Sequence, residues 1–193
     1  MVDFLFPIPL WKFSLDVAEE NYIKAISYCE QFYNKDPGVQ YTNVGGWQSP
    51  HMTGSEVRFT PLKLFFNQID DKANDILHSF NSKSNFEISN FWINVNFLGN
   101  KNSKHWHPSS DLSGVFYLTD KNSKLVFFRE KDHMMFLMEK LSSYSYKNTN
   151  LFSNYYEPKR GDVYIFPSFL EHLVEENTDS QPRVSVAFNF KIT

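Results

Sequence analysis

The hydrophobic pattern changes its period near residue 85, and this change divides the chain into two parts. Before it, apolar residues recur at helical spacing in two stretches, residues 17–34 and 60–80. After it, apolar and polar residues alternate as they do in strands, and turn-forming residues interrupt the alternation every ~8 to 12 residues. The pattern predicts two helices followed by roughly eight short strands.

Both predicted helices have recognisable ends. Asp16 is expected to cap the first helix, and Asp36-Pro37-Gly38 is expected to end it. Thr60 and Pro61 fit the N-cap and the first position of the second helix. The residues that would form the buried faces are Val17, Ile23, Ile26, Tyr28 and Phe32 in the first helix, and Leu62, Phe65, Phe66, Ile69, Ala73, Ile76, Leu77 and Phe80 in the second.

Three further segments are interpreted from their prolines, their glycines and their composition. Residues 5–13 are apolar but contain Pro7 and Pro9, so an edge strand is expected there. Residues 43–50 carry two glycines that predict a loop, and its Trp47 is expected either to pack on the barrel wall or to close over a site. Residues 130–157 combine methionines with a Ser-, Tyr- and Asn-rich stretch, which predicts an insert or lid.

Strands with this spacing predict a mainly β fold, a β-sandwich or jelly roll with the N-terminal helices packed outside. Residues 1–193 are expected to form a single domain, since no linker, repeat or low-complexity tract divides them. Residues 1–85 would be the helical part, and residues 86–193 would be the barrel with its insert near residues 130–157.

The composition argues for a folded protein without a polyanionic partner. Hydrophobic residues make up 41% of the chain and aromatic residues 18%, which excludes a disordered chain. The formal charge of −3 provides no overall attraction to nucleic acid or to an anionic membrane.

Residues 1–11 do not resemble a signal peptide, and no apolar run approaches the ~18 residues of a membrane span. The one cysteine, Cys29, fits a core position and a reducing, cytoplasmic compartment. The oligomeric state stays open, a homodimer included.

Two histidines stand at alternate positions in the segment His105-Trp106-His107-Pro108. In extended backbone, residues i and i+2 point to the same side with Cα atoms about 6.5 to 7 Å apart, so both imidazoles can reach one ion. A third ligand would come from a distant strand, and His172 lies beside a later apolar run. These three residues are candidate metal ligands if the fold brings their segments together.

The last predicted strand, residues 183–190, carries a candidate anion site. Arg183 and Ser185 lie on one face of it. An arginine that points into a barrel is unfavourable unless it meets an anion, and a guanidinium suits a carboxylate. On an earlier strand, Asn94 and Asn96 share a face with Trp92, and they are candidates for lining a pocket.

Several short motifs, separated along the chain, follow one another in a recognisable order. The motifs are Gly45–Ser49, Asn94-x-Asn96, His105–Pro108 leading to Ser113–Leu118, and Phe166–His172 followed by Arg183–Asn189. By this pattern the chain resembles the 2-oxoglutarate- and Fe(II)-dependent oxygenases of the double-stranded β-helix class, over roughly residues 5–190. The resemblance implies a jelly-roll, cupin-like fold and an enzyme that couples decarboxylation of 2-oxoglutarate to succinate with the oxidation of a second substrate.

The resemblance also implies the cofactors and several residue roles. Fe(II) would be the metal, and 2-oxoglutarate would be the small-molecule co-substrate. The metal ligands would be His105, His172 and His107, and the far carboxylate of 2-oxoglutarate would contact Arg183 and Ser185. Tyr117 would either touch the co-substrate or pack in the core. Trp47, Asn94 and Asn96 are the candidates for the substrate pocket.

One position departs from the wider class, whose members usually carry an acidic residue where this chain has His107. A site with a third imidazole keeps one more positive charge than the usual site. Asp111 and Glu171 are the nearby carboxylates that could replace His107, although Glu171 alternates to the opposite face of a strand. The other histidines lie in loop or helix patterns and are expected in solvent: His51, His78 and His133.

Two other interpretations stay open from the sequence. A cupin-like metalloenzyme with three histidines would use no keto acid, and Arg183 would then bind a carboxylate of the substrate itself. A non-catalytic jelly-roll protein could retain the same pocket for binding. The primary substrate is also open, since a protein side chain, a nucleotide and a small metabolite are all compatible with the motifs.

Overall fold

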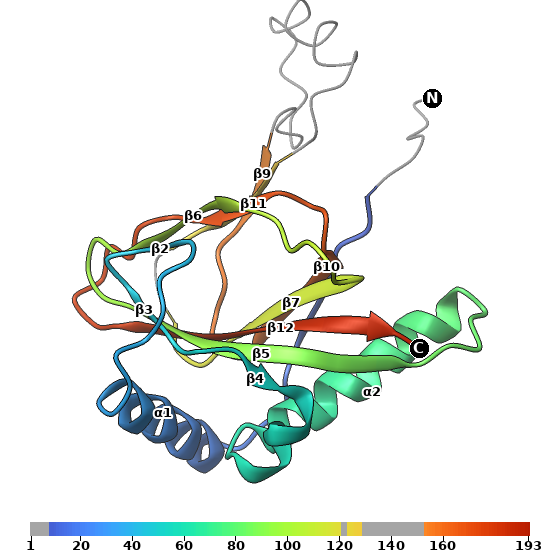
Figure 1. Cartoon of the computed structure of the whole chain (residues 1–193), viewed down its shortest axis with the longest axis horizontal. Coiled ribbons are helices and arrows are strands. Elements are labelled where there is room, and N and C mark those ends of the chain that lie inside the picture. Colours follow the sequence, from blue (N-terminus) through green and yellow to red (C-terminus); the bar gives the residue numbers. More distant parts are fainter. Residues whose placement is uncertain (1–7, 121–122, 129–152) are drawn as a thin grey trace, which may run out of the picture.

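The protein is described by a computed structural model, which covers residues 8–120, 123–128 and 153–193. It has three layers: two α-helices, a seven-stranded sheet and a five-stranded sheet. Figure 1 shows both helices on one side of the large sheet and the small sheet on the other. The predicted jelly roll with helices outside is confirmed: among the described residues eight strands follow the second helix, as expected, and four further short strands precede it.

The strands are distributed between the two sheets as follows. The large sheet contains β1 (Trp11–Ser14), β3 (Trp47–Gln48), β4 (Met52–Thr53), β5 (Phe86–Asn96), β7 (Leu112–Tyr117), β10 (Asp162–Pro167) and β12 (Arg183–Ile192). The small sheet contains β2 (Asn43–Val44), β6 (Lys101–His105), β8 (Leu125–Phe128), β9 (Ser153–Tyr156) and β11 (His172–Val174). The large sheet has the order β1-β10-β7-β12-β5-β3 with β4 also paired to β5, and the small sheet has the order β2-β6-β11-β8-β9.

Helix α2 (Lys63–Ser79) buries most of the predicted apolar stripe, but Phe80 follows the helix and is exposed. The helix begins two residues later than predicted, after the short 3-10 helix η1 (Gly54–Phe59) and a turn at residues 61–62. Thr60 is therefore not its N-cap. Instead, the Thr60 hydroxyl donates to the carbonyl of Val57 at 2.8 Å and accepts from the N–H of Leu62 at 3.2 Å, so it stabilises the junction between the two helices.

Helix α1 (Glu19–Tyr33) uses most of the predicted apolar stripe: Ile26, Tyr28 and Phe32 are partly buried against the core, as is Val17 just before the helix. Tyr22, Ala25 and Cys29 are buried, whereas Ile23 is exposed. The ring of Tyr22 packs on that of Phe65 in α2 at 5.1 Å, whereas Ile23, the next residue, points to solvent. Asp16 does not cap the helix: its main chain is bonded to the side chain of Gln68 in α2 instead.

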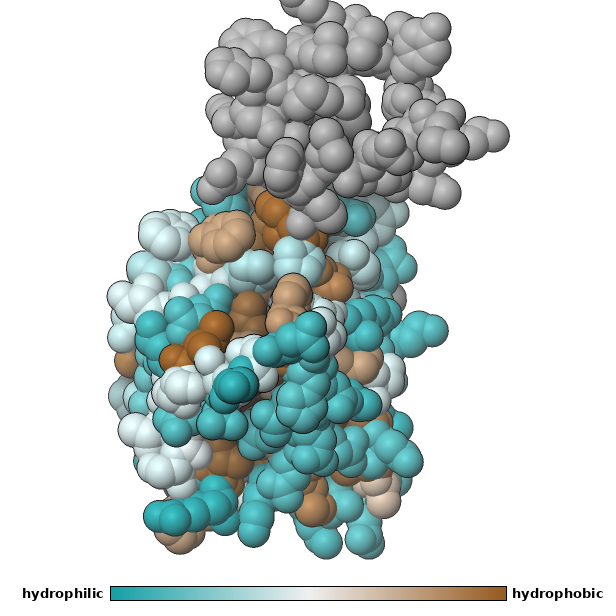
Figure 2. Space-filling model, turned by 90° about the vertical axis from the view of Figure 1, so that its right-hand side faces the viewer, coloured by the Kyte–Doolittle hydropathy of each residue, from teal (hydrophilic) through white to brown (hydrophobic). Residues whose placement is uncertain are grey.

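Two hydrophobic cores fill the spaces between the layers. In the core between helices and large sheet, the ring of Phe66 lies 5.3, 5.4 and 5.7 Å from those of Phe91, Phe116 and Phe188. Full burial of one such side chain contributes about 1.5 to 3 kcal/mol. The smaller core lies between the sheets and consists of Tyr117, Leu125, Phe127, Tyr164, Phe166 and Leu170. On the side drawn in Figure 2, the described surface is mostly hydrophilic, with hydrophobic residues in small groups.

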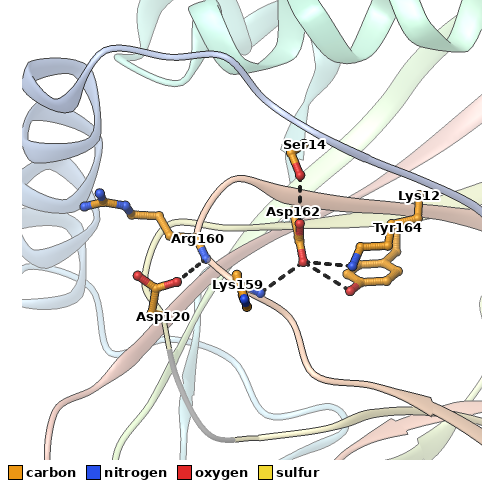
Figure 3. Close-up of polar contacts among 7 residues, drawn as sticks. All are labelled: Lys12, Ser14, Asp120, Lys159, Arg160, Asp162 and Tyr164. Atoms are coloured by element: carbon orange, nitrogen blue, oxygen red, sulfur yellow. Dashed lines mark hydrogen bonds and ion pairs between the residues drawn. The ribbon is translucent and has the colours of Figure 1, made fainter.

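Strand β1 stands at the edge of the large sheet, and a buried carboxylate fastens it to β10. Asp162 lies opposite Ser14 in the register of these strands. Its carboxylate accepts hydrogen bonds from the Ser14 hydroxyl at 2.9 Å and the Lys159 N–H at 3.1 Å, and it lies 3.2 Å from the Lys12 ammonium (Figure 3). Burial alone would raise the pKa of Asp162, but these donors outweigh burial and hold the pKa below its usual value.

The glycine-containing segment and the insert differ from their predictions. Residues 43–50 contain two short strands, because β2 pairs with β6 and β3 pairs with β5, and the two glycines form the bend between them. Of the insert predicted at residues 130–157, Ser153–Tyr156 form β9, which pairs with β8, and residues 129–152 lie outside the described part of the chain. No helix within the described ranges combines the length and apolar character needed to span a bilayer.

Candidate metal centre

Two strands of the small sheet bring a pair of histidines together. His105 ends β6 and His172 begins β11, and the antiparallel register of these strands sets the two residues opposite each other, with ring centroids 4.3 Å apart. The ring of His107, two residues beyond β6, lies 5.0 Å from that of His105 and 5.1 Å from that of His172. One ring nitrogen of each histidine lies within 4.8 Å of the other two. The three segments therefore converge.

Hydrogen bonds determine which ring nitrogen is available in two of these histidines. The Nδ1–H of His105 donates to the carbonyl of Ser103 at 2.7 Å, and the Nδ1–H of His172 donates to the carbonyl of Leu170 at 2.9 Å. A carbonyl can only accept, so both Nε2 atoms keep their lone pairs. The Nε2 of His107 lies 3.2 Å from that of His172. Metal-binding histidines commonly donate their second ring N–H in this way, which fixes the ring orientation.

The surroundings keep the three imidazoles neutral. Burial lowers the pKa of His105, although the hydrogen bond to Ser103 acts in the opposite direction. Burial, followed by the proximity of His172, lowers the pKa of His107 to about 2. Burial and the proximity of His105 lower the pKa of His172 to about 3. A neutral imidazole is the form that binds a divalent metal, so the donor set fits a transition metal such as iron.

The two carboxylates considered as substitutes are engaged elsewhere. Asp111 accepts a hydrogen bond from the N–H of Ile192 at 2.9 Å and lies 3.8 Å from the ammonium of Lys191. Glu171 forms an ion pair of 2.6 Å with Lys104. In the described part of the chain, the cluster of potential ligands consists of the three histidines alone. The geometry therefore gives no support to a carboxylate ligand from either residue.

The histidines lie in the wall of a cavity of about 500 Å³. Residues of both sheets line it, among them Asn94, Tyr117 and Ser185 from the large sheet and Leu125 from the small sheet. Among the described lining residues other than histidines, Lys191 is the only one that carries a charge at neutral pH. The cavity is thus mainly a neutral space of aromatic, amide and hydroxyl groups, as is typical of small-molecule sites.

A buried arginine lies two residues before Ser185 on the same face of β12. Arg183 is 2% exposed and is not itself among the lining residues. Its Nη1 donates to the Ser123 hydroxyl and to the Glu175 carbonyl, but its Nε has no acceptor among the described residues. The buried hydroxyl of Tyr117 also has no partner there. Burial lowers the pKa of Arg183, and Tyr117 acts in the opposite direction. Two unpaired buried donors suit an anionic oxygen ligand.

The three pocket candidates from the sequence lie in different places. Asn94 lines the cavity, and its Oδ1 has no partner within the described ranges. Asn96 is buried, donates to Asn102 and does not line the cavity. Trp47 lies outside the lining as well, because its ring packs against α1 and its indole N–H donates to the carbonyl of Asp36 at 3.0 Å. Of the two roles considered for this tryptophan, the structure shows packing.

The sequence did not indicate that His51 lines the cavity, and this residue was expected in solvent. Its exposed ring stacks on that of Trp92 at 4.7 Å, and the ring of Trp92 lies 5.5 Å from that of His107. Tyr41 adds another ring 5.5 Å from His51. All of these residues line the cavity. The only local signal is that His51 follows β3, and the pairing of β3 with β5 cannot be read from the chain.

Comparison with protein families gives one match. A family model described as "Putative 2OG-Fe(II) oxygenase" matches residues 90–189. That range contains the three converging histidines and also Tyr117 and Arg183. A search of curated proteins finds no match.

Several solved structures share the fold over nearly the whole chain. A Pseudomonas putida prolyl-4-hydroxylase is 11% identical with a TM-score of 0.66, over 95% of this chain and 92% of that one. The epimerase SnoN, in complex with Fe3+, alpha-ketoglutarate and nogalamycin RO, is 8% identical with a TM-score of 0.66, over 95% and 78%. A Trichoplax adhaerens prolyl hydroxylase, in complex with a hypoxia inducible factor peptide fragment, is 11% identical with a TM-score of 0.60, over 94% and 82%. Because these sequence identities are low, the similarity shows a shared fold only.

Proposed function

The chain belongs to the 2OG-Fe(II) oxygenase family, and we propose that His105, His107 and His172 bind the Fe(II) of this enzyme. The observation that carries the proposal is the convergence of three neutral imidazoles in the wall of one neutral cavity. When bound, Fe(II) and 2-oxoglutarate would supply the oxidising chemistry with O2 as the oxidant: one oxygen atom would enter succinate as CO2 leaves, and the other would hydroxylate or otherwise oxidise the second substrate.

The protein holds its proposed ligands in place before the metal arrives. The carbonyls of Ser103 and Leu170 accept from the Nδ1–H groups of His105 and His172, so each Nε2 is already directed to the common point. The cross-strand pairing of β6 and β11 fixes the distance between these two rings. A ligand set that needs little rearrangement loses less entropy on binding and therefore binds more tightly.

Arg183, Tyr117 and Ser185 are proposed to hold the far carboxylate of 2-oxoglutarate. The Arg183 Nε and the Tyr117 hydroxyl are the unpaired buried donors, and Ser185 lies opposite Tyr117 in the strand register. Arg183 also donates to Ser123 and Glu175, and these bonds orient its guanidinium. A carboxylate at this place would satisfy donors that have no acceptor among the described residues.

The primary substrate is proposed to present an uncharged group to the metal centre. Trp92, His51 and Tyr41 form an aromatic rim beside His107, and they line the same cavity as the amide of Asn90. Moving a charged group into this space would leave it without a counter-ion, apart from Lys191, which already lies 3.8 Å from Asp111. Aromatic faces and neutral amides instead suit rings, carbonyls and hydroxyl groups.

Anaerobic titration of 2-oxoglutarate into the Fe(II) protein tests the assignment. The wild-type protein should develop a metal-to-ligand charge-transfer band, and Arg183→Leu should weaken keto-acid affinity by roughly 30-fold or more, since a buried charge-assisted contact is worth about 2 to 5 kcal/mol. Iron affinity should not change. Arg160→Leu is the matched control, because the Arg160 guanidinium lies at the surface 2.8 Å from Glu19.

The outcome of this titration separates the open interpretations. A wild-type protein that binds iron but gives no band at millimolar 2-oxoglutarate would be a three-histidine metalloenzyme that uses no keto acid. A protein that retains neither iron nor keto acid would be a binding protein. Equal keto-acid affinities for wild type and Arg183→Leu would remove Arg183 from the site.

A further inference from the structure

Three residues of the sequence motifs, Ser113, Ser168 and Asn189, have no part in the proposed metal and co-substrate sites, yet they are buried and hydrogen-bonded to one another. Ser113, Asn189 and Asn90 stand directly opposite one another on the adjacent strands β7, β12 and β5. The Ser113 hydroxyl donates to Oδ1 of Asn189 at 2.7 Å, and Nδ2 of Asn189 donates to Oδ1 of Asn90 at 2.9 Å. With Ser168, these side chains form what we term the polar row.

The polar row continues into the loop that carries His107. Because Ser113 gives its only hydroxyl proton to Asn189, Ser168 must be the donor in the 2.9 Å contact between the two serines. The main chain of Ser168 makes two further bonds: its carbonyl accepts from the N–H of His107 at 2.9 Å, and its N–H donates to the carbonyl of Asp111 at 3.2 Å. Ser168 therefore joins the 107–111 loop to the large sheet.

His107 depends on such a connection more than the other two histidines do. His105 and His172 belong to paired strands, and their rings also donate to carbonyl groups. His107 instead lies beyond the end of β6, in a loop where Ser109 has a φ of 69°, an uncommon conformation for a residue with a side chain. The bond to Ser168 ties the backbone of this loop to the rest of the fold.

A β-bulge aligns the row beneath this loop. Asn189 lies opposite Asn90, but Phe190 lies opposite Ile88, so Ser89 is an extra residue on β5. Bulges re-aim side chains and are frequent beside active sites. Here the Ser89 hydroxyl donates to the carbonyl of Asn189 at 3.2 Å, and this bond stabilises the bulged backbone of β5 beside the polar row.

We propose that the polar row of Asn90, Asn189, Ser113 and Ser168 positions His107 and thereby sets the metal affinity of the site. The inference rests on the proposed function, since it takes His107 as a ligand. The four residues act through the Ser168 main chain and not by contact with the metal. Residues that orient metal ligands typically contribute about 10- to 100-fold in affinity, and that is the range expected for this row.

A double-mutant cycle with Co(II), a redox-stable substitute for Fe(II), tests the proposal. Ser113→Ala should weaken Co(II) binding by about 10- to 100-fold. In the His107→Ala background, where the two remaining ligands bind weakly and the titration extends to millimolar Co(II), the same substitution should cause no further loss, because the residue on which the row acts is gone. Asn189→Leu breaks the row at a second point and should behave in the same way. Visible absorption of the Co(II) protein should also change with the loss of one nitrogen ligand.

Ser49→Ala is the matched control. Ser49 is a buried serine whose hydroxyl accepts from the N–H of Ile93 at 3.0 Å and makes no bond to the row. This variant should lose stability but keep its Co(II) affinity, so it separates general loosening of the fold from loss of positioning. Unfolding curves of all variants establish that each is folded when its affinity is measured.

The possible failures are distinguishable. Unchanged Co(II) affinity in both row variants, or the same loss in the presence and absence of His107, would overturn the positioning role while leaving the proposed ligands intact. Unchanged affinity in His107→Ala alone would show that His107 is not a ligand, and then the proposed ligand set fails together with the row.

Discussion

At the scale of single residues, the centre differs from the usual facial triad in having a third imidazole at His107. The structure shows why a neutral side chain is accommodated there. Its ring is packed between Trp92 and His172, at centroid distances of 5.5 and 5.1 Å, and burial keeps it uncharged. The nearby carboxylates Asp111 and Glu171 interact with lysines instead.

Replacement of His172 by alanine is expected to abolish stoichiometric Co(II) binding, because two ligands hold a labile divalent ion far more weakly than three. The loss should exceed the ~100-fold upper range that changes around a ligand produce. Equilibrium dialysis measures it. His51→Ala is the control, since His51 lies beside the centre but does not converge with the three rings. A His172→Ala protein with wild-type affinity would exclude His172 as a ligand.

Replacement of His107 by aspartate is expected to keep the metal bound, because it creates the two-histidine, one-carboxylate set that Fe(II) oxygenases commonly use. The added negative charge should raise the affinity for a divalent ion relative to His107→Ala. Comparison of Co(II) isotherms for wild type, His107→Asp and His107→Ala measures this. Loss of binding in the aspartate variant as severe as in the alanine variant would speak against a ligand at this position.

At the scale of secondary structure elements, β1 depends on one residue of its partner strand. Asp162→Asn should reduce the free energy of unfolding by about 1.5 to 3 kcal/mol at neutral pH, since hydrogen bonds to a charged acceptor are replaced by bonds to a neutral one. The ion pair with Lys12 contributes little to this free energy, because the Lys12 side chain is 44% exposed and water screens the interaction. Urea unfolding measures the difference.

The same substitution has a defined pH dependence. The donors around Asp162 depress the pKa of its carboxyl in the folded protein. Its contribution to stability is therefore fully present above the unfolded-state pKa of about 3.9 and is lost as the pH falls through the folded-state value. The stability difference between wild type and Asp162→Asn should shrink below about pH 4. A difference that stays constant down to pH 2 would contradict this account.

Strand β7 packs against β12 through a position that tolerates no side chain. A Cβ at Gly114 would collide with the ring of Phe188 and would lie 2.9 Å from the carbonyl oxygen of Tyr164. Gly114→Ala should reduce the free energy of unfolding by about 1 to 3 kcal/mol through overpacking. Adding Phe188→Leu should recover part of that loss, because the smaller side chain can make room. Additive effects of the two substitutions in urea unfolding would show that this contact does not limit the packing.

At the scale of the whole molecule, metal binding is expected to stabilise the fold, since the three proposed ligands come from β6, β11 and the loop between β6 and β7. A metal at 100 times its dissociation constant adds about 2.7 kcal/mol to the free energy of unfolding. Thermal unfolding with and without Co(II) should show a higher midpoint for wild type and no shift for His172→Ala. A chelator should reverse the wild-type shift, and an equal shift in both proteins would place the metal elsewhere.

The sequence by itself determined the fold class, the types of most elements and the candidate ligands. These conclusions rest on local periodicity, which depends only on residues a few positions apart. Alternation in residues 86–98 placed Trp92 and Asn94 on one face of β5, and both line the cavity in the structure. The i, i+2 spacing of His105 and His107 likewise indicated that both rings could reach one ion.

Only the tertiary structure decided which distant residues meet. The opposition of His105 and His172, the polar row across β5, β12 and β7, and the stacking of His51 on Trp92 all depend on strand register. Register arises from pairing between segments far apart in the chain, so no local pattern encodes it. Helical spacing likewise did not show that Ile23 of α1 is exposed while Ala25 is fully buried, because that depends on which distant residues the helix packs against.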